Sequence, residues 1–141
     1  MKHRLSLTRW HSVAERIKAA VGEREARAIA SRDKADLAFV EAGLSALAAI
    51  RGALARRNVE LGIADKLAEA EAVSRRAMLY LAIVEKERGA KGATDLENLI
   101  LKLAADQALA RVLLDEVVAL NRAKLELELP DELTAVAGLA A

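Results

Sequence analysis

The feature that most constrains the fold is the near absence of residues that interrupt helices. The chain has one proline, Pro130, and seven glycines in 141 residues. A many-stranded sheet needs frequent Gly- and Pro-rich turns, so this scarcity argues against a β-sandwich, a barrel or a doubly wound α/β fold. Ala fills 32 positions and Leu 23, and both are strong helix formers. Because 54% of the residues are hydrophobic, the chain can bury a core and is not expected to be disordered.

Apolar residues recur every three or four positions along most of the chain, which is the pattern of amphipathic helices. The first segment is expected to form a shorter N-terminal helix or helices over 7–30, with Gly22 as a candidate break. Its start is ambiguous, because Thr8 is a candidate cap and Ser12 opens a candidate capping box. Three longer helices are predicted at 31–61, 64–88 and 94–121.

Within 31–61, a seven-residue repeat of coiled-coil type is the clearest signal. Ile50 lies one residue off this seam and widens the apolar face, which favours a bundle over a narrow two-stranded zipper. Arg51 and Asn58 occupy two seam positions, where they either fix the register or reach water at the seam edge. The apolar seam positions are Leu37, Val40, Leu44, Leu47, Leu54 and Leu61.

Gly62 is predicted to end this helix in the left-handed conformation, with Ile63 as the hydrophobic contact that follows. Because the connection is so short, 31–61 and 64–88 are expected to be antiparallel neighbours. The first half of 64–88 is rich in alanine, which permits close approach of a partner helix. The predicted face comprises Leu67, Ala70, Val73, Ser74, Ala77, Leu81 and Val84.

Gly89–Ala93 has the composition of an interhelical loop, and the Thr94-x-x-Glu97 pattern is typical of a capping box. The helix that follows, 94–121, has apolar residues on more than one face. Such a helix is either central to a bundle or covered by a second subunit.

The tail changes period. Residues 124–129 alternate strictly between apolar and charged side chains, which predicts a short strand that ends at Pro130. A shorter alternation at 4–8 is the candidate partner strand, so we expect a two-stranded ribbon within a subunit or across subunits. A short helix is predicted at 131–139. The sequence thus predicts a single all-α domain, an antiparallel helical bundle or long helical hairpin with a minor β ribbon.

Charge is distributed unevenly along the chain. The net charge is +4 over 1–36 and −5 over 94–141, so the two ends are expected to attract each other within the chain or between subunits. The basic N-terminus leads into Thr8–His11 and not into an apolar segment, so we expect no secretory signal. No run approaches about 18 consecutive apolar residues, and no membrane span or membrane partner is expected.

Motifs for catalysis are missing from the sequence. There is no cysteine, and neither His3 nor His11 has the E-x-x-H spacing of helical metal sites. No serine lies in a G-x-S-x-G turn. Residues 89–94 (GAKGAT) lack the spacing of a phosphate-binding P-loop. The chain is therefore expected to be non-enzymatic, with no metal and no cofactor.

The leading hypothesis is a helical structural or assembly protein that acts through self-association or a permanent protein partner. The setting expected for such a building block is the cytoplasm or a virion- or phage-type assembly. An unpartnered 94–121 would expose more apolar surface than soluble monomers usually tolerate, which predicts a homo-oligomer or a protein partner. The candidate interface comprises Leu99, Leu103, Leu109, Val112, Leu113, Val117, Leu125, Leu127 and Leu129.

The alternative is a nucleic-acid-associated regulator with a basic N-terminal arm and two arginine pairs. Glu60, Glu69 and Glu71 are interleaved with these charges, and aromatic residues for base stacking make up only 2% of the chain. The candidate contacts are Lys2, Arg4, Arg9, Arg56, Arg57, Arg75 and Arg76.

Overall fold

The computed structural model describes residues 1–87 and 96–139, which form two compact units. Unit 1 comprises Met1–Glu60 and Asn121–Ala141, and unit 2 comprises Leu61–Leu120. The prediction of a single domain stays a prediction. The Gly89–Ala93 loop and Thr94 of the proposed capping box lie outside the described residues.

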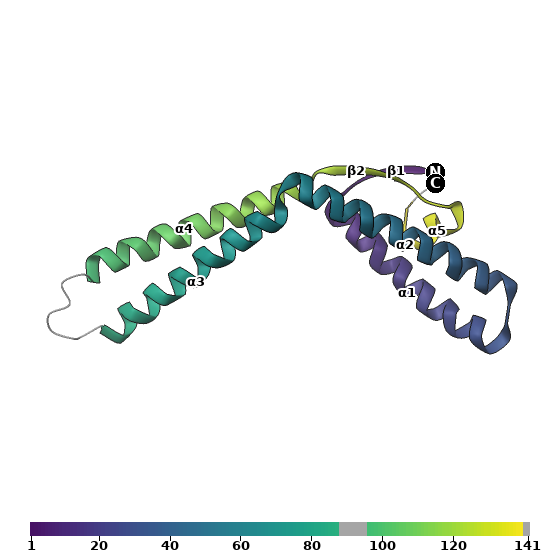
Figure 1. Cartoon of the computed structure of the whole chain (residues 1–141), viewed down its shortest axis with the longest axis horizontal. Coiled ribbons are helices and arrows are strands. Elements are labelled where there is room, and N and C mark those ends of the chain that lie inside the picture. Colours follow the sequence, from purple (N-terminus) through teal and green to yellow (C-terminus); the bar gives the residue numbers. More distant parts are fainter. Residues whose placement is uncertain (88–95, 140–141) are drawn as a thin grey trace. The chain divides into compact units, whose positions relative to one another are not determined.

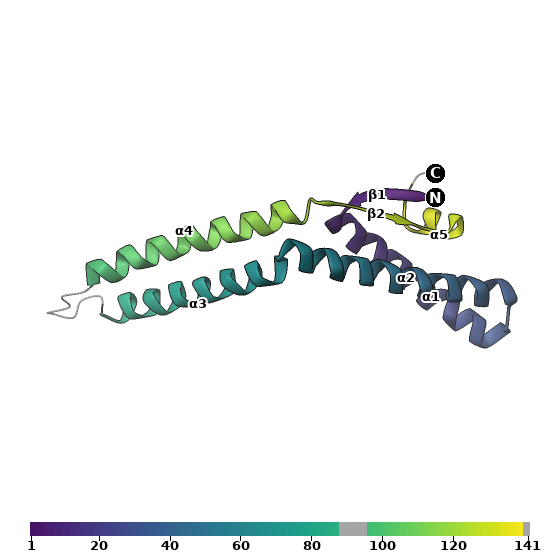
Figure 2. The same cartoon turned by 45° about the horizontal axis from the view of Figure 1, so that its top comes forward.

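Seven elements follow the path shown in Figures 1 and 2. All four long helices have 25 to 28 residues. The predicted class is confirmed: helices form the hairpins α1·α2 and α3·α4, and the chain ends form a short antiparallel ribbon. The elements are β1 (Lys2–Ser6), α1 (Leu7–Ser31), α2 (Lys34–Leu61), α3 (Ile63–Glu87), α4 (Leu96–Leu120), β2 (Lys124–Glu128) and α5 (Asp131–Val136).

The ribbon of unit 1 pairs the two predicted strands within one chain. Lys2 lies opposite Glu128, and Ser6 lies opposite Lys124. Trp10, which is fully buried at the start of α1, donates its indole N–H to the Leu125 carbonyl at 2.7 Å. A buried indole N–H without an acceptor is costly, so this bond ties the ribbon to the core of unit 1.

The start of α1 differs from both candidates drawn from the sequence. Ser6 is the cap, and its hydroxyl accepts a hydrogen bond from the Arg9 amide at 3.3 Å. The helix then continues through Gly22, where a side chain would meet nothing within 4 Å. An exposed glycine weakens a helix by less than about 1 kcal/mol, which packing of the flanking turns overcomes. α1 is therefore a single helix with almost the predicted bounds of 7–30, and it is as long as α3 and α4.

The buried face of α2 includes Val40, Leu47 and Leu54 of the predicted repeat but not Leu37 or Leu44. Leu37 and Leu44 are 51% and 55% exposed, whereas Ile50, placed off the seam, is 1% exposed. A β-carbon at Gly43 would collide with Val21 of α1, so the helices approach closely there. Small residues that the repeat did not include, Gly43, Ala46 and Ala53, share the buried face with larger ones. The buried set is Asp36, Phe39, Val40, Gly43, Ala46, Leu47, Ile50, Ala53 and Leu54.

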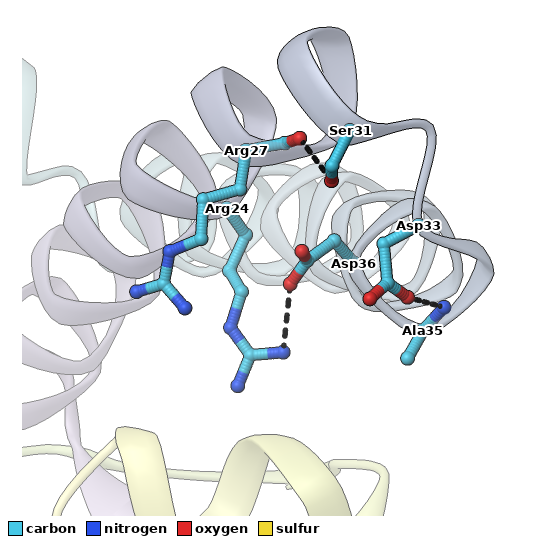
Figure 3. Close-up of polar contacts among 6 residues, drawn as sticks. All are labelled: Arg24, Arg27, Ser31, Asp33, Ala35 and Asp36. Atoms are coloured by element: carbon cyan, nitrogen blue, oxygen red, sulfur yellow. Dashed lines mark hydrogen bonds and ion pairs between the residues drawn. The ribbon is translucent and has the colours of Figure 1, made fainter.

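The turn between α1 and α2 is fixed by polar contacts (Figure 3). Arg32 takes the left-handed conformation, with φ of 55°, and ends α1. Asp33 then accepts a hydrogen bond from the Ala35 amide at 2.7 Å. Arg24 binds the Asp36 carboxylate at 3.3 Å and lies 4.4 Å from the ring centroid of Phe39. These contacts hold α2 against α1 at the end where no glycine marks the turn.

The pairing of the helices corrects one prediction. Gly62 does adopt the expected left-handed conformation, with φ of 65°. The helices on either side of it were expected to pack against each other, but α2 packs against α1 and α3 packs against α4. A short connection restricts where a helix can go, but it does not decide the partner when each helix has a better-matched face elsewhere.

We predict opposite effects for two glycine substitutions in α1 and α2. Gly43→Leu overpacks the helix contact and should lower the free energy of unfolding by about 1–3 kcal/mol. Gly22→Leu adds a helix-favouring side chain in open space and should raise it by about 0.5–1 kcal/mol. Chemical denaturation followed by circular dichroism measures both. Equal effects of the two substitutions would contradict the close contact at Gly43.

Candidate functional site

The α3·α4 hairpin has a core of unusually small side chains. Its buried cluster consists of Ala70 and Val73 of α3 with Ala110 and Leu113 of α4. Helices of this length gain most of their stability from packing and not from intrinsic propensity. With Ile63, Ala77 and Val117, seven apolar residues of the two helices are buried, and three of the seven are alanines.

Two ion pairs align the helices. Arg76 donates two hydrogen bonds to Asp106, at 2.7 and 2.8 Å, and Asp106 is buried. The hydrogen bonds and charge of Arg76 hold the pKa of Asp106 below its usual value, and the same carboxylate raises the pKa of Arg76. Lys66 binds Glu116 at 2.7 Å, and this hydrogen bond raises the pKa of Lys66. The two contacts fix the register of the hairpin, that is, which residue of α3 lies at the same height along the helices as which residue of α4.

Large apolar side chains cover the outside of this hairpin. Met78 is 70% exposed and Leu101 is 67% exposed. Surfaces of this kind on a folded unit mark an interaction site or an aggregation hazard. Ten of the fifteen exposed large apolar residues in the described chain lie in unit 2: Leu67, Met78, Leu79, Leu81, Ile100, Leu101, Leu109, Val112, Leu114 and Val118.

Part of this apolar surface forms a groove of about 570 Å³ between α3 and α4. The small residues Ser74, Ala77 and Ala110 line it together with Met78, Leu81, Gln107, Arg111, Leu114 and Asp115. Leu67 on α3 and Ile100 and Val118 on α4 continue the same stripes at helical spacing. We call the face defined by Leu67, Ser74, Met78, Leu81, Ile100, Gln107, Arg111, Leu114 and Val118 the groove face.

The predicted interface residues divide between surface and interior. Leu109 and Val112 are 40% and 52% exposed, as an interface in an isolated chain requires. Leu99, Leu103, Leu125 and Leu127 are half-buried. Leu113, Val117 and Leu129 are buried within the chain, because the first two face α3 and the third packs in unit 1.

The sequence reasoning missed most of the groove face. The signal was present as a second stripe on α4, formed by Ile100, Gln107, Arg111, Leu114 and Val118 at steps of three, four and seven. Two charged or polar members hid this stripe. Its orientation also depends on which side of α4 faces α3, which only the structure shows.

The basic residues of the alternative hypothesis are mostly neutralised. Lys2 pairs with Glu126, Arg57 with Glu60, Arg75 with Glu71 and Arg76 with Asp106. Lys2, Arg4 and Arg9 lie at the start of unit 1, and Arg56 and Arg57 lie near the end of α2. Arg75 and Arg76 belong to unit 2, so the structure does not gather the seven residues into one patch within either unit.

A second, more polar groove lies between α1 and α2. It measures about 310 Å³ and presents His11, Glu15, Arg51 and Asn58. The Asn58 side-chain oxygen is buried and lacks a hydrogen-bond partner among the described residues. His11 is exposed, and no group of three or more potential metal ligands occurs within residues 1–87 and 96–139. This groove therefore presents polar side chains without a set of potential metal ligands among the described residues.

One helix would also suit a membrane by length and hydropathy, namely α2. Core helices of soluble proteins meet the same criteria, and Phe39, Leu47 and Ile50 of α2 are buried within unit 1. Packing in unit 1 accounts for the buried part of α2, whereas Leu37 and Leu44 stay exposed.

Comparison with protein-family models gives no match, and neither the curated proteins nor the solved structures give a significant one. The functional interpretation therefore depends on the geometry of the hairpin.

We predict that Asp106 makes hairpin stability depend on pH. A carboxylate whose pKa is lowered on folding stabilises the fold above its unfolded pKa of about 4, and loses that effect as pH falls through the lower folded pKa. Asp106→Asn should lower the thermal midpoint at pH 7, and the difference from the unmodified chain should shrink as the pH falls below about 4. Glu69→Gln, which alters an exposed carboxylate of α3 outside the groove, is the control. A pH-independent difference would contradict the role of Arg76.

Proposed function

We propose that this chain is a non-enzymatic structural or assembly protein that acts through self-association or a permanent protein partner. The groove face of the α3·α4 hairpin is the contact surface. The setting we propose is the cytoplasm or a virion- or phage-type assembly, where compact helical units serve as building blocks.

The observation that supports this proposal is the imbalance between the core and the surface of unit 2. Seven apolar residues of α3 and α4 are buried, three of them alanines, whereas ten large apolar residues of unit 2 are exposed. Burying apolar surface yields about 25 cal/mol per Å², so covering the exposed side chains adds to the stability of the hairpin. An interface that completes a core in this way is permanent in character and not transient.

The proposal predicts an oligomer or complex that an acidic residue on the groove face disrupts. Leu114→Asp should weaken association at least tenfold, because the carboxylate is buried without a partner. The matched control is Leu101→Asp, since Leu101 is exposed on α4 but lies off the groove face. Light scattering on a size-exclusion column at several concentrations measures the mass of each variant.

The result that would overturn the proposal is a monomer at all concentrations with a stably helical 61–120 segment. Such a chain would need neither a second copy nor another protein to cover its hairpin.

The nucleic-acid alternative is less well supported, because four of its seven candidate residues already bind carboxylates. Phosphate contacts release counterions, so true binding would weaken steeply with salt. We predict no salt-sensitive rise in fluorescence anisotropy of a labelled duplex. Salt-sensitive binding that is lost on combined substitution of Arg4, Arg9 and Arg56 by Ala would favour the alternative instead.

A further inference from the structure

We infer that the partner of the groove face is a second copy of the same hairpin, packed face to face about a two-fold axis parallel to the helices. This inference rests on the proposed function and specifies its partner. The product is a four-helix bundle in which α3 of each copy lies on α4 of the other.

The register of the hairpin supplies the first argument. Lys66 is level with Glu116, and Arg76 is level with Asp106, so the numbers of level residues add to 182 in both pairs. A two-fold axis parallel to the helices preserves height along them. Every α3 residue therefore meets the same level of α4 in the partner as it does in its own chain.

The second argument is the composition of the outer rows of the two helices. Side chains seven residues apart share a face, and Met78 and Arg111, both at the groove, define one row on each helix. On α3 this row is Ala64, Glu71, Met78 and Glu85. On α4 it is Glu97, Ala104, Arg111 and Val118.

The two rows complement each other at the inherited register. Glu71 meets Arg111 of the second copy, and Met78 meets Ala104, so a charge faces its opposite and a large side chain faces a small one. Ala64 meets Val118 in the same way. Arg111 makes none of the described ion pairs within its own chain, whereas Glu71 forms an exposed ion pair with Arg75 at 3.7 Å, which the contact with Arg111 must share or replace. The symmetry operation forms each contact twice.

One level opposes this arrangement. Glu85 faces Glu97, and the two like charges meet beside residues 88–95, at the end of the hairpin. Both residues are exposed there, where solvent screens their repulsion. The pairs Glu71–Arg111 and Met78–Ala104 lie further from this end of the hairpin, where association removes water and strengthens each contact.

Charge reversal tests the register directly. Glu71→Arg and Arg111→Glu should each weaken self-association at least tenfold, and the double variant should restore it to within about threefold. The control reversals are Glu69→Arg and Lys102→Glu, which alter exposed residues of the same helices outside the groove face. They should change the dissociation constant less than threefold by analytical ultracentrifugation.

Cysteine cross-linking gives an independent readout, because the natural chain has no cysteine. Met78→Cys combined with Ala104→Cys should form a covalent dimer with oxidised glutathione, since the two thiols meet across the axis. Met78→Cys combined with Ala105→Cys places the second thiol on another face of α4. It should remain uncross-linked on a non-reducing gel.

The outcomes separate this inference from the proposed function. An oligomer without rescue by the double reversal and without the 78–104 cross-link overturns the face-to-face arrangement alone. A stably folded monomer overturns the proposed function as well. Rescue together with the specific cross-link supports both.

Discussion

The structure of unit 2 depends on the contact between α3 and α4. Three of the residues buried there are alanines, whereas large apolar side chains are exposed on the outside of the hairpin. Alanines at positions 70, 77 and 110 let α3 and α4 approach closely, and small side chains bury little apolar area. The bidentate contact between Arg76 and Asp106 and the pair Lys66–Glu116 then set the alignment of the helices. Polar contacts of this kind specify geometry more than they stabilise it, because charges lose hydration when they pair. The proposed association would bury the large apolar side chains that the hairpin leaves exposed.

Unit 1 solves the same problem internally. Its helices also meet through small residues, with Gly43 of α2 against Val21 of α1. The ribbon and α5 add a further layer, in which Leu129 and Leu133 are almost completely buried. Trp10 joins that layer to α1 through its bond to the Leu125 carbonyl. The two chain ends thus cover α1, whereas the described residues of unit 2 contain only α3 and α4 and their short junctions. This difference between the units is why we assign assembly to the hairpin.

The sequence was informative where a local rule acts alone. The strict alternation at 124–129 and its mate at the N-terminus predicted the ribbon, and apolar periodicity predicted the four helices. It was misleading where the answer depends on packing partners. Leu37 and Leu44 satisfied a leucine repeat but are exposed, because Gly43 and Ala46 allow closer contact on the neighbouring face. The groove face was not predicted because Arg111 and Gln107 interrupt its apolar stripe. In addition, residue spacing alone does not show which side of α4 faces α3.

The central claim is that the hairpin is stabilised by association. Hydrogen–deuterium exchange read by mass spectrometry, at protein concentrations above and below the dissociation constant, tests it most directly. Stabilisation that comes from binding a second copy depends on protein concentration, whereas stabilisation that comes from packing within one chain does not. The account predicts that amides of 63–87 and 96–120 lose protection on dilution while those of 7–31 keep theirs. Equal protection of the hairpin amides at every concentration would contradict it.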